Sequence, residues 1–289
     1  MKAIASIAPV LIWAGFAGAA QAERLTKNET THQTLHFAGP APHVLEIRVV
    51  DGAINIEGYD GTDVEMTVDK SISATGDAEL QRALSDVVLE TADNAAKVGA
   101  VARYREGDTC GEKSHSHNDG RDWPGYEVRY DFTIRVPRNT RIEVCTINRG
   151  DVTVKGTRES FRISSINGRI DLIDMGGAGD ATTINGGIAA SFVTAPRTDS
   201  LFKTINGNLV LTMPDSFAAD LDMKTFTGGL FTDFDTAPRA VQTVVQSHRE
   251  GGQFVYQANP FATVRIGNGG PLLTLETLNG DVRVLRRAR

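Results

Sequence analysis

The chain repeats one four-residue pattern as Ser165-Ile166-Asn167-Gly168, Thr183-Ile184-Asn185-Gly186 and Thr204-Ile205-Asn206-Gly207. Weaker copies are Thr146-Ile147-Asn148, Thr225-Phe226-Thr227-Gly228 and Thr277-Leu278-Asn279-Gly280. The glycines at 168, 186, 207 and 228 follow one another at steps of 18 to 21 residues. A repeat at a nearly fixed step of about 20 residues indicates a fold built from stacked, equivalent units.

Each copy is followed by a pair of residues two positions apart, a spacing that places both on one face of a β-strand. In four copies both are apolar: Val152 and Val154, Ile170 and Leu172, Leu209 and Leu211, Val282 and Val284. The pairs Ile188/Ala190 and Leu230/Thr232 are degenerate versions. The repeat therefore predicts a short strand with one buried face after every turn.

Asn-Gly between two strands is compatible with two topologies. It can close a β-hairpin, since both residues tolerate positive φ, and the chain would then be a meander. Alternatively, each unit is one coil of a parallel β-solenoid (a short-coil β-helix), in which equivalent side chains stack and hydrogen-bond to their copies. We favour the all-β solenoid, because a meander gives no reason to repeat one side chain at one step. The expected ladder contains Thr146, Asn148, Ser165, Asn167, Thr183, Asn185, Thr204, Asn206, Thr277 and Asn279.

The strand period also assigns faces to the repeat. In Leu221–Thr225 and Leu273–Thr277 the apolar residues and the threonine share a face, so this threonine should point inward, and Cys145 falls on the outer face. The next residue of each copy should lean outward: Ile147, Ile166, Ile184, Ile205, Phe226 and Leu278. An apolar row of this size is unusual in water. Either the turn buries it, the helix expected at 77–89 covers it, or it is a docking surface.

The part before the repeats divides into a polar lead at 23–42 and a strand-and-helix cap at 43–139. Alternating apolar residues predict strands at 44–50, 53–56, 64–68, 98–104 and 126–136, and Asp51-Gly52 is a tight-turn signal. Residues 77–89 change to the three- and four-residue spacing of a short amphipathic helix. Residues 43–289 are thus predicted to form a single domain, with the repeats at 140–285.

The first 22 residues have the order of a secretory signal peptide. Lys2 is followed by an apolar stretch from Ile4 to Phe16, and Ala20-Gln21-Ala22 is a small-x-small cleavage site. The stretch is too short to span a bilayer, and no later segment is apolar enough to do so. We therefore expect a periplasmic or secreted mature chain without a membrane span.

Net charge argues against one class of partner. The formal charge is −6, and it becomes −7 once Lys2 is removed. Nucleic-acid binding needs clustered basic residues, and the only cluster is Arg286, Arg287 and Arg289. We expect these arginines to form a solvated tail and expect no nucleic acid as partner.

The two cysteines, Cys110 and Cys145, form the only possible intramolecular pair, and an oxidising compartment favours the disulfide. The loop at 107–126 contains Cys110 together with His115, His117, Asp119 and Asp122. These are possible metal ligands, but His-x-His on a polar loop is a weak signal, so we assign no metal site and no cofactor.

A family resemblance follows from the order of these features. The chain resembles the bacterial putative-adhesin domain family in the order of five features. These are a helix, a strand ending in Ile134 to Pro137, the Thr-x-Asn-Gly units, the segment at 266–270 and a closing segment from Leu275 to Val282. The resemblance covers about residues 43–285 and implies a β-solenoid in or on the cell envelope, with no assigned catalytic residues. The Cys110–Trp123 loop and the interval from Gly228 to Gly280 depart from the family's pattern.

The predicted function is that of an exported, non-catalytic, adhesin-like protein that binds an envelope polymer or a protein partner. A polysaccharide-acting β-helix enzyme and a structural scaffold subunit are the alternatives. An enzyme would need two facing carboxylates, and Asp151 and Asp171 are candidates, expected in one column with Asp281 and about 5 Å apart. The sequence has no phosphate-binding loop, Gly-x-Ser-x-Gly, Cys-x-x-Cys or His-Glu-x-x-His. Ligand and oligomeric state are not indicated.

Overall fold

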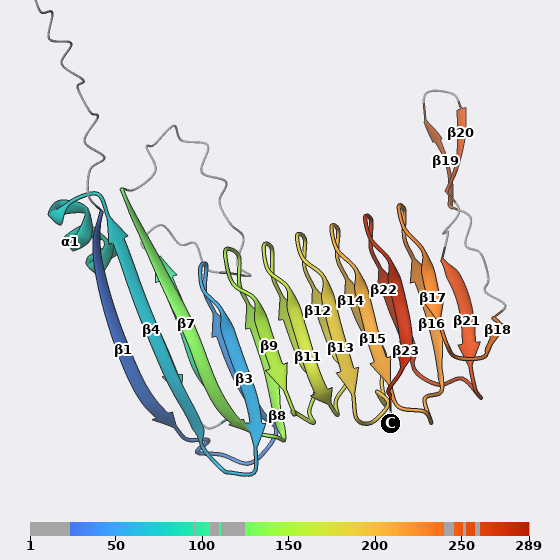
Figure 1. The fold of residues 1–289 in the computed structure, drawn as a ribbon, viewed down its shortest axis with the longest axis horizontal. Helices are drawn as coiled ribbons and strands as arrows, with labels where there is room; N and C mark the ends of the chain where they lie inside the picture. Colours follow the sequence, from blue (N-terminus) through green and yellow to red (C-terminus); the bar gives the residue numbers. More distant parts are fainter. Residues whose placement is uncertain are drawn as a thin grey trace, which may run out of the picture.

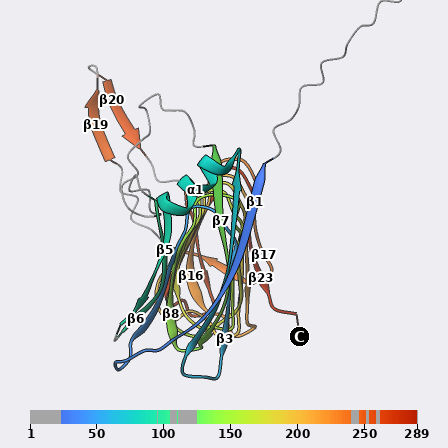
Figure 2. The same ribbon diagram turned by 90° about the vertical axis from the view of Figure 1, so that its left-hand side faces the viewer.

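The computed structural model describes residues 24–94, 96–104, 110, 125–239, 246–250, 253–257 and 261–288. This part of the chain is all-β with one helix, and two large sheets face each other along an elongated stack (Figures 1 and 2). The expected signal peptide and both loop histidines, His115 and His117, lie outside the described residues. No helix in the described part is long and apolar enough to cross a membrane.

The first sheet has ten strands. Its members, in spatial order, are β1 (Leu25–Leu35), β4 (Val64–Ala74), β7 (Tyr126–Pro137), β3 (Ile54–Tyr59), β9 (Val152–Lys155), β11 (Ile170–Met175), β13 (Ile188–Phe192), β15 (Leu209–Met213), β23 (Val282–Arg286) and β17 (Leu230–Thr232). Pairing is antiparallel from β1 to β7 and parallel from β7 to β17.

The second sheet has eleven strands. Its members are β18 (Thr236–Pro238), β21 (Ala262–Ile266), β16 (Ala219–Lys224), β22 (Leu272–Glu276), β14 (Ser200–Lys203), β12 (Gly179–Thr182), β10 (Phe161–Ser164), β8 (Thr140–Cys145), β2 (His43–Arg48), β6 (Lys97–Tyr104) and β5 (Val87–Asp93). Pairing is parallel from β16 to β6 and antiparallel at both ends. Both sheets are therefore mixed, not uniformly parallel.

Each Asn-Gly turn joins the two sheets and does not close a hairpin. β10 lies in the second sheet and pairs with β8 and β12, whereas β11, directly after the turn, lies in the first sheet and pairs with β9 and β13. One unit thus contributes one strand to each sheet, and neighbouring units stack at about the 4.8 Å strand spacing. The hairpin meander is wrong for these turns.

The core lies between the two sheets, where the inward residues of every unit meet. The pair predicted after each turn is buried in five copies, as Ile170 and Leu172 illustrate at no more than 1% exposure, whereas Leu230 of the sixth pair is 36% exposed. Phe202, fully buried in the second sheet, packs near Phe161 and edge-on against Phe192 of the first. Burial of such side chains contributes about 1.5–3 kcal/mol each, so the alternating pattern accounts for much of the stability.

The stack begins one unit earlier than the repeat pattern predicts. β2 pairs with β8 and β3 with β9, so Asp51-Gly52 takes the place of an Asn-Gly turn, and Asp51 is bridged to Asn148. The expectation of a tight turn at Asp51-Gly52 is correct, but β2 and β3 lie in different sheets. The sequence pattern did not identify this unit, because Val49 and Asp51 replace the threonine and asparagine of the pattern.

The last unit of the sequence is not the last unit of the stack. β22 lies between β14 and β16, and β23 lies between β15 and β17. The C-terminal strand pair is therefore inserted between two units that precede it in sequence (Figure 1). This insertion explains the long interval between Gly228 and Gly280, across which units could not be counted from the sequence.

Two expectations for the N-terminal end are wrong. Residues 25–35, taken as a polar lead, form β1, which pairs along its whole length with β4. The helix α1 (Asp77–Asp86) ends three residues earlier than expected, and β5 begins at Val87. Leu80 and Leu84 of α1 pack on the core, and the helix lies at the top of this end of the stack (Figure 2).

A separate hairpin of β19 (Gln246–Glu250) and β20 (Gln253–Gln257) projects from the opposite end (Figure 1). Its two strands pair only with each other among the described strands.

Candidate binding edge

The turns from the second sheet to the first lie one above another along one long edge of the stack, which we call the turn edge. Its inner layer consists of buried hydroxyl residues: Thr146, Ser165, Thr183, Thr204 and Thr277. The ladder prediction required these hydroxyl groups to hydrogen-bond to their copies in neighbouring units, and they do not. Instead Thr183 Oγ1 donates to the carbonyl of Gly168 at 3.0 Å, and Thr204 and Thr277 bond to Gly186 and Gly207 in the same way.

The asparagines of the turn edge form a continuous hydrogen-bonded row, which we call the Asn row. Each Nδ2 donates to the Oδ1 of the preceding unit, over 2.7–3.2 Å, and Thr227 Oγ1 donates to Asn279 Oδ1 at 2.9 Å. In spatial order the row is Asn148, Asn167, Asn185, Asn206, Asn279 and Thr227. These side chains bond to their copies as expected, but they are exposed and not buried.

Beside the Asn row runs a row of exposed apolar side chains, the apolar row. It consists of Ile166, Ile184, Ile205, Leu278 and Phe226, which are 37%, 39%, 37%, 47% and 79% exposed, with the partly buried Ile147 at its start. The expected outward orientation is therefore correct. The turns do not bury these side chains, and α1 packs on β4, β5 and β7 at the end of the stack. Within the described residues, neither of the two covering explanations is supported.

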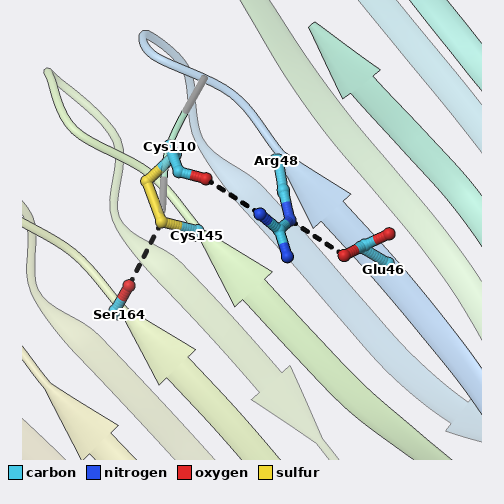
Figure 3. The surroundings of a disulfide bond; sticks show 5 residues. All are labelled: Glu46, Arg48, Cys110, Cys145 and Ser164. Carbon is cyan, nitrogen blue, oxygen red and sulfur yellow. Dashed lines mark hydrogen bonds and ion pairs between the residues drawn. A yellow bond between two sulfur atoms is a disulfide. The ribbon is translucent and has the colours of Figure 1, made fainter. Parts of the chain in front are cut away.

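The disulfide joins Cys110 to Cys145, at the end of β8 next to the turn edge, with the Cα atoms 5.6 Å apart. Cys145 is on the outer face as expected, in register with Ser164, whose Oγ lies 3.2 Å from the cysteine sulfur (Figure 3). Arg48 donates to the carbonyl of Cys110 at 3.3 Å and pairs with Glu46 (Figure 3). Residue 110 is thereby attached to two neighbouring strands, β8 and β2.

Asp51 lies at the head of the Asn row, across a bridge from Asn148. The side chain is nearly buried, and its Oδ1 has no hydrogen-bond partner. Burial raises the pKa of Asp51 above its ordinary value of 3.8, because Arg149 and Arg129 offset the lost hydration only in part. The ionised form is thus disfavoured in the folded state.

Asp51→Asn is expected to gain stability relative to the wild type as pH rises. A carboxyl with a raised pKa contributes most to stability when protonated, below 3.8, and that contribution is lost as pH rises through the folded-state pKa. Urea unfolding of both proteins from pH 3.5 to 7 measures the difference. A difference that stays constant with pH would contradict the argument.

Asp281→Asn is the matched control with the opposite sign. The backbone N–H of Gly229 and the Arg283 guanidinium hold the pKa of Asp281 below its ordinary value. Its contribution is present above the ordinary pKa and lost as pH falls through the lowered one. Asp281→Asn should therefore lose stability relative to the wild type as pH rises.

The outer face of the second sheet carries paired charges. Lys203 and Lys224 flank Glu276 at 2.9 and 3.5 Å, and Arg48 and Lys97 flank Glu46 at 2.8 and 3.0 Å. Burial raises the pKa of each glutamate, but the flanking cations outweigh it and lower the pKa below the ordinary value. This face is polar and internally neutralised, unlike the apolar row.

The carboxylates considered for catalysis have structural partners. Asp151 accepts the backbone N–H of Arg169 at 2.8 Å, and Asp171 pairs with the Arg169 guanidinium at 2.8 Å. Asp171 is not in the column of Asp151 and Asp281, because it is in register with Thr153 of β9. The aspartates directly after the turn, Asp151 and Asp281, hold the backbone of a neighbouring unit instead, since Asp281 likewise accepts the N–H of Gly229.

Arg286 and Arg287 are in contact with solvent, as expected, but they are anchored to the stack and do not form a free tail. The backbone N–H of Arg286 donates to Asp233, and the guanidinium of Arg287 pairs with Asp174 at 2.8 Å. No group of three or more possible metal ligands comes together within the described ranges.

The chain matches no family model, and no curated protein matches it. Among solved structures it is similar to one described as a putative cell adhesion protein from Clostridium sporogenes. That similarity has a TM-score of 0.48 at 10% identity and covers 90% of this chain and 100% of the other. It is too weak to carry an argument about function, and membership of the putative-adhesin family stays a prediction.

One member of the turn edge, Asp51, escaped the sequence reasoning. The signal was present, because Val49-Val50-Asp51-Gly52 precedes an apolar pair, Ile54 and Ile56, as most later copies do. A search for strand, turn and apolar pair without fixed residue types would have found it.

Proposed function

We propose that this protein is an exported, non-catalytic, adhesin-like module whose repeats form a β-solenoid and which binds a cell-envelope partner through the turn edge. The single observation that carries the proposal is the exposed apolar row. Ile166, Ile184 and Ile205 recur at the same place in successive units and stay in contact with solvent. A contiguous exposed apolar surface on a protein marks a site of interaction.

Three further observations support the proposal. The repeat units from β2 to β17 are stacked in parallel register, which is the geometry of a solenoid. A disulfide of this kind persists in oxidising compartments, which favours export. Asp151 and Asp171 are engaged by Arg169, which favours binding over catalysis.

Co-sedimentation with the insoluble cell-envelope fraction of the source organism tests the proposal. The wild type should sediment with it, and the double variant Ile184→Ser/Ile205→Ser should lose about tenfold or more in affinity, since two apolar contacts are removed. The matched control is Ile173→Ser/Val193→Ser, which changes two exposed aliphatic residues away from the turn edge, one in β11 and one directly after β13. Equal sedimentation of the two double variants would refute a role for the turn edge.

A further inference from the structure

The turn edge presents two chemically different rows with one common step. Within the Asn row each asparagine from Asn167 to Asn279 uses one N–H and one lone pair of Oδ1. The primary amide has two N–H donors and two lone pairs, so each exposed side chain keeps one donor and one acceptor for another molecule. Beside it, each unit offers one aliphatic side chain, as Ile184 does next to Asn185.

Charge restricts what can lie on these rows. The four-residue turns of the five copies from Ser165 on, at 165–168, 183–186, 204–207, 225–228 and 277–280, contain no Asp, Glu, Lys, Arg or His, whereas the first turn contains Arg149. A polyanion such as a nucleic acid or an acidic glycan needs basic residues along its path. The partner that complements these five units is therefore neutral.

Periodicity restricts the partner further. The units repeat at about the 4.8 Å strand spacing, so equivalent donors, acceptors and methyl groups recur at that step. The surface of a folded protein that lacks such a repeat could match only one or two units. A linear polymer with a similar step can occupy every unit at once, and its weak contacts then add up through multivalency.

We propose that the turn edge binds a straight, neutral, β-1,4-linked polysaccharide chain laid along the stack. A pyranose ring has an apolar C–H face that suits the apolar row and a rim of hydroxyls that suits the free amide groups of the Asn row. In a β-1,4-linked chain the rings form an extended ribbon, and one ring is about as long as one unit spacing. Phe226, 79% exposed at the end of the row, provides an aromatic face on which a ring can stack.

The inference rests on the proposed function and names the partner class of the same edge. Isothermal titration calorimetry with the full chain and the series from cellobiose to cellohexaose, and with chitohexaose, tests it. Affinity for the cellulose-derived series is expected to rise with each added sugar, because each occupies a further unit. Maltohexaose, the same sugar in a coiled α-1,4 chain, should bind about tenfold or more weakly than cellohexaose.

Variants locate the site on the edge. Ile184→Ser/Ile205→Ser should weaken binding of the hexasaccharides about tenfold or more, Phe226→Ala should also weaken it, and Ile173→Ser/Val193→Ser should leave it unchanged. Circular dichroism confirms that each variant is folded. Absence of binding by both cellohexaose and chitohexaose, equal binding of maltohexaose, or binding that survives the edge variant would overturn the inference.

The outcome is separable from that of the proposed function. One outcome is that Ile184→Ser/Ile205→Ser no longer sediments with the envelope fraction, while neither cellohexaose nor chitohexaose binds the wild type. The glycan inference is then wrong, and the proposed envelope-binding function is retained with a protein as the partner. Chromatography of the oligosaccharides after incubation adds a second check, since they should remain intact. Cleavage that disappears in Asp151→Asn or Asp171→Asn would contradict the non-catalytic proposal itself.

Discussion

Deletion of residues 272–289 is expected to abolish cooperative folding of the C-terminal half of the stack. The deletion removes β22 and β23, which together supply four fully buried side chains, Leu273, Leu275, Val282 and Val284. At about 1.5–3 kcal/mol each, their loss amounts to roughly 6–12 kcal/mol. The whole free energy of unfolding of a domain is only about 5–15 kcal/mol.

The position of the deleted pair makes the effect larger than an end truncation. β22 and β23 are hydrogen-bonded on both sides, so their loss separates β16 and β17 from β14 and β15 and leaves unpaired edges on both. Hydrogen exchange should show protection lost from residue 200 onward. The control replaces 246–257 by a short Gly-Ser loop, because β19 and β20 pair only with each other among the described strands. A deletion variant as stable as this control would refute the inserted arrangement.

Gly207→Ala is expected to destabilise the stack by about 3 kcal/mol or more, at or beyond the upper end of overpacking costs. A Cβ at Gly207 would lie 2.2 Å from the carbonyl oxygen of Gly186 and 2.5 Å from its carbon. Both are backbone atoms of the next unit, so no side-chain rotation can relieve the contact. The units would have to move apart and break the bonds of the Asn row around Asn206.

Gly76→Ala is the matched control for this substitution. Gly76 precedes α1 with extended backbone, φ 172°, and an added Cβ meets no atom within 4 Å. The free energy of unfolding, measured in urea, should fall strongly for Gly207→Ala and stay nearly constant for Gly76→Ala. Similar values for the two would mean that the units are not in close backbone contact at Gly207.

The sequence predicted the repeat turns because their physics is local. A typical turn contains a small hydroxyl residue, an outward apolar residue, an asparagine and a glycine. Each of the four has one structural role within its own turn, and these roles recur in the other copies. The inward pairs, such as Leu209 and Leu211, were predicted for the same reason, since alternation within one strand determines their face.

The order of the units could not be predicted, because one copy of the pattern fits equally well next to any other. Nothing in Thr277 to Gly280 distinguishes a place between two earlier units from a place at the end. β1 was missed for a different reason. It is an edge strand, exposed on both faces along most of its length, so it lacks the buried face that produces an alternating pattern.

The signal peptide and the histidine loop lie outside the described residues, so those expectations remain predictions. The disulfide is present, and its location beside the turn edge was predictable because Cys145 directly precedes Thr146.

The hydrogen bonds of the Asn row all run in one direction. Each donor of the row, from Thr227 Oγ1 through Asn206 Nδ2 to Asn167 Nδ2, bonds to the Oδ1 of the neighbour closer to Asn148. A single side chain cannot turn over without breaking its hydrogen bonds to both neighbours. The amide dipoles of the row therefore share one orientation and can reverse only together. Asp51 lies next to Asn148, at the end toward which these bonds point. A chain molecule lying along the turn edge therefore meets a surface with a head and a tail, which can distinguish the two directions of a polymer.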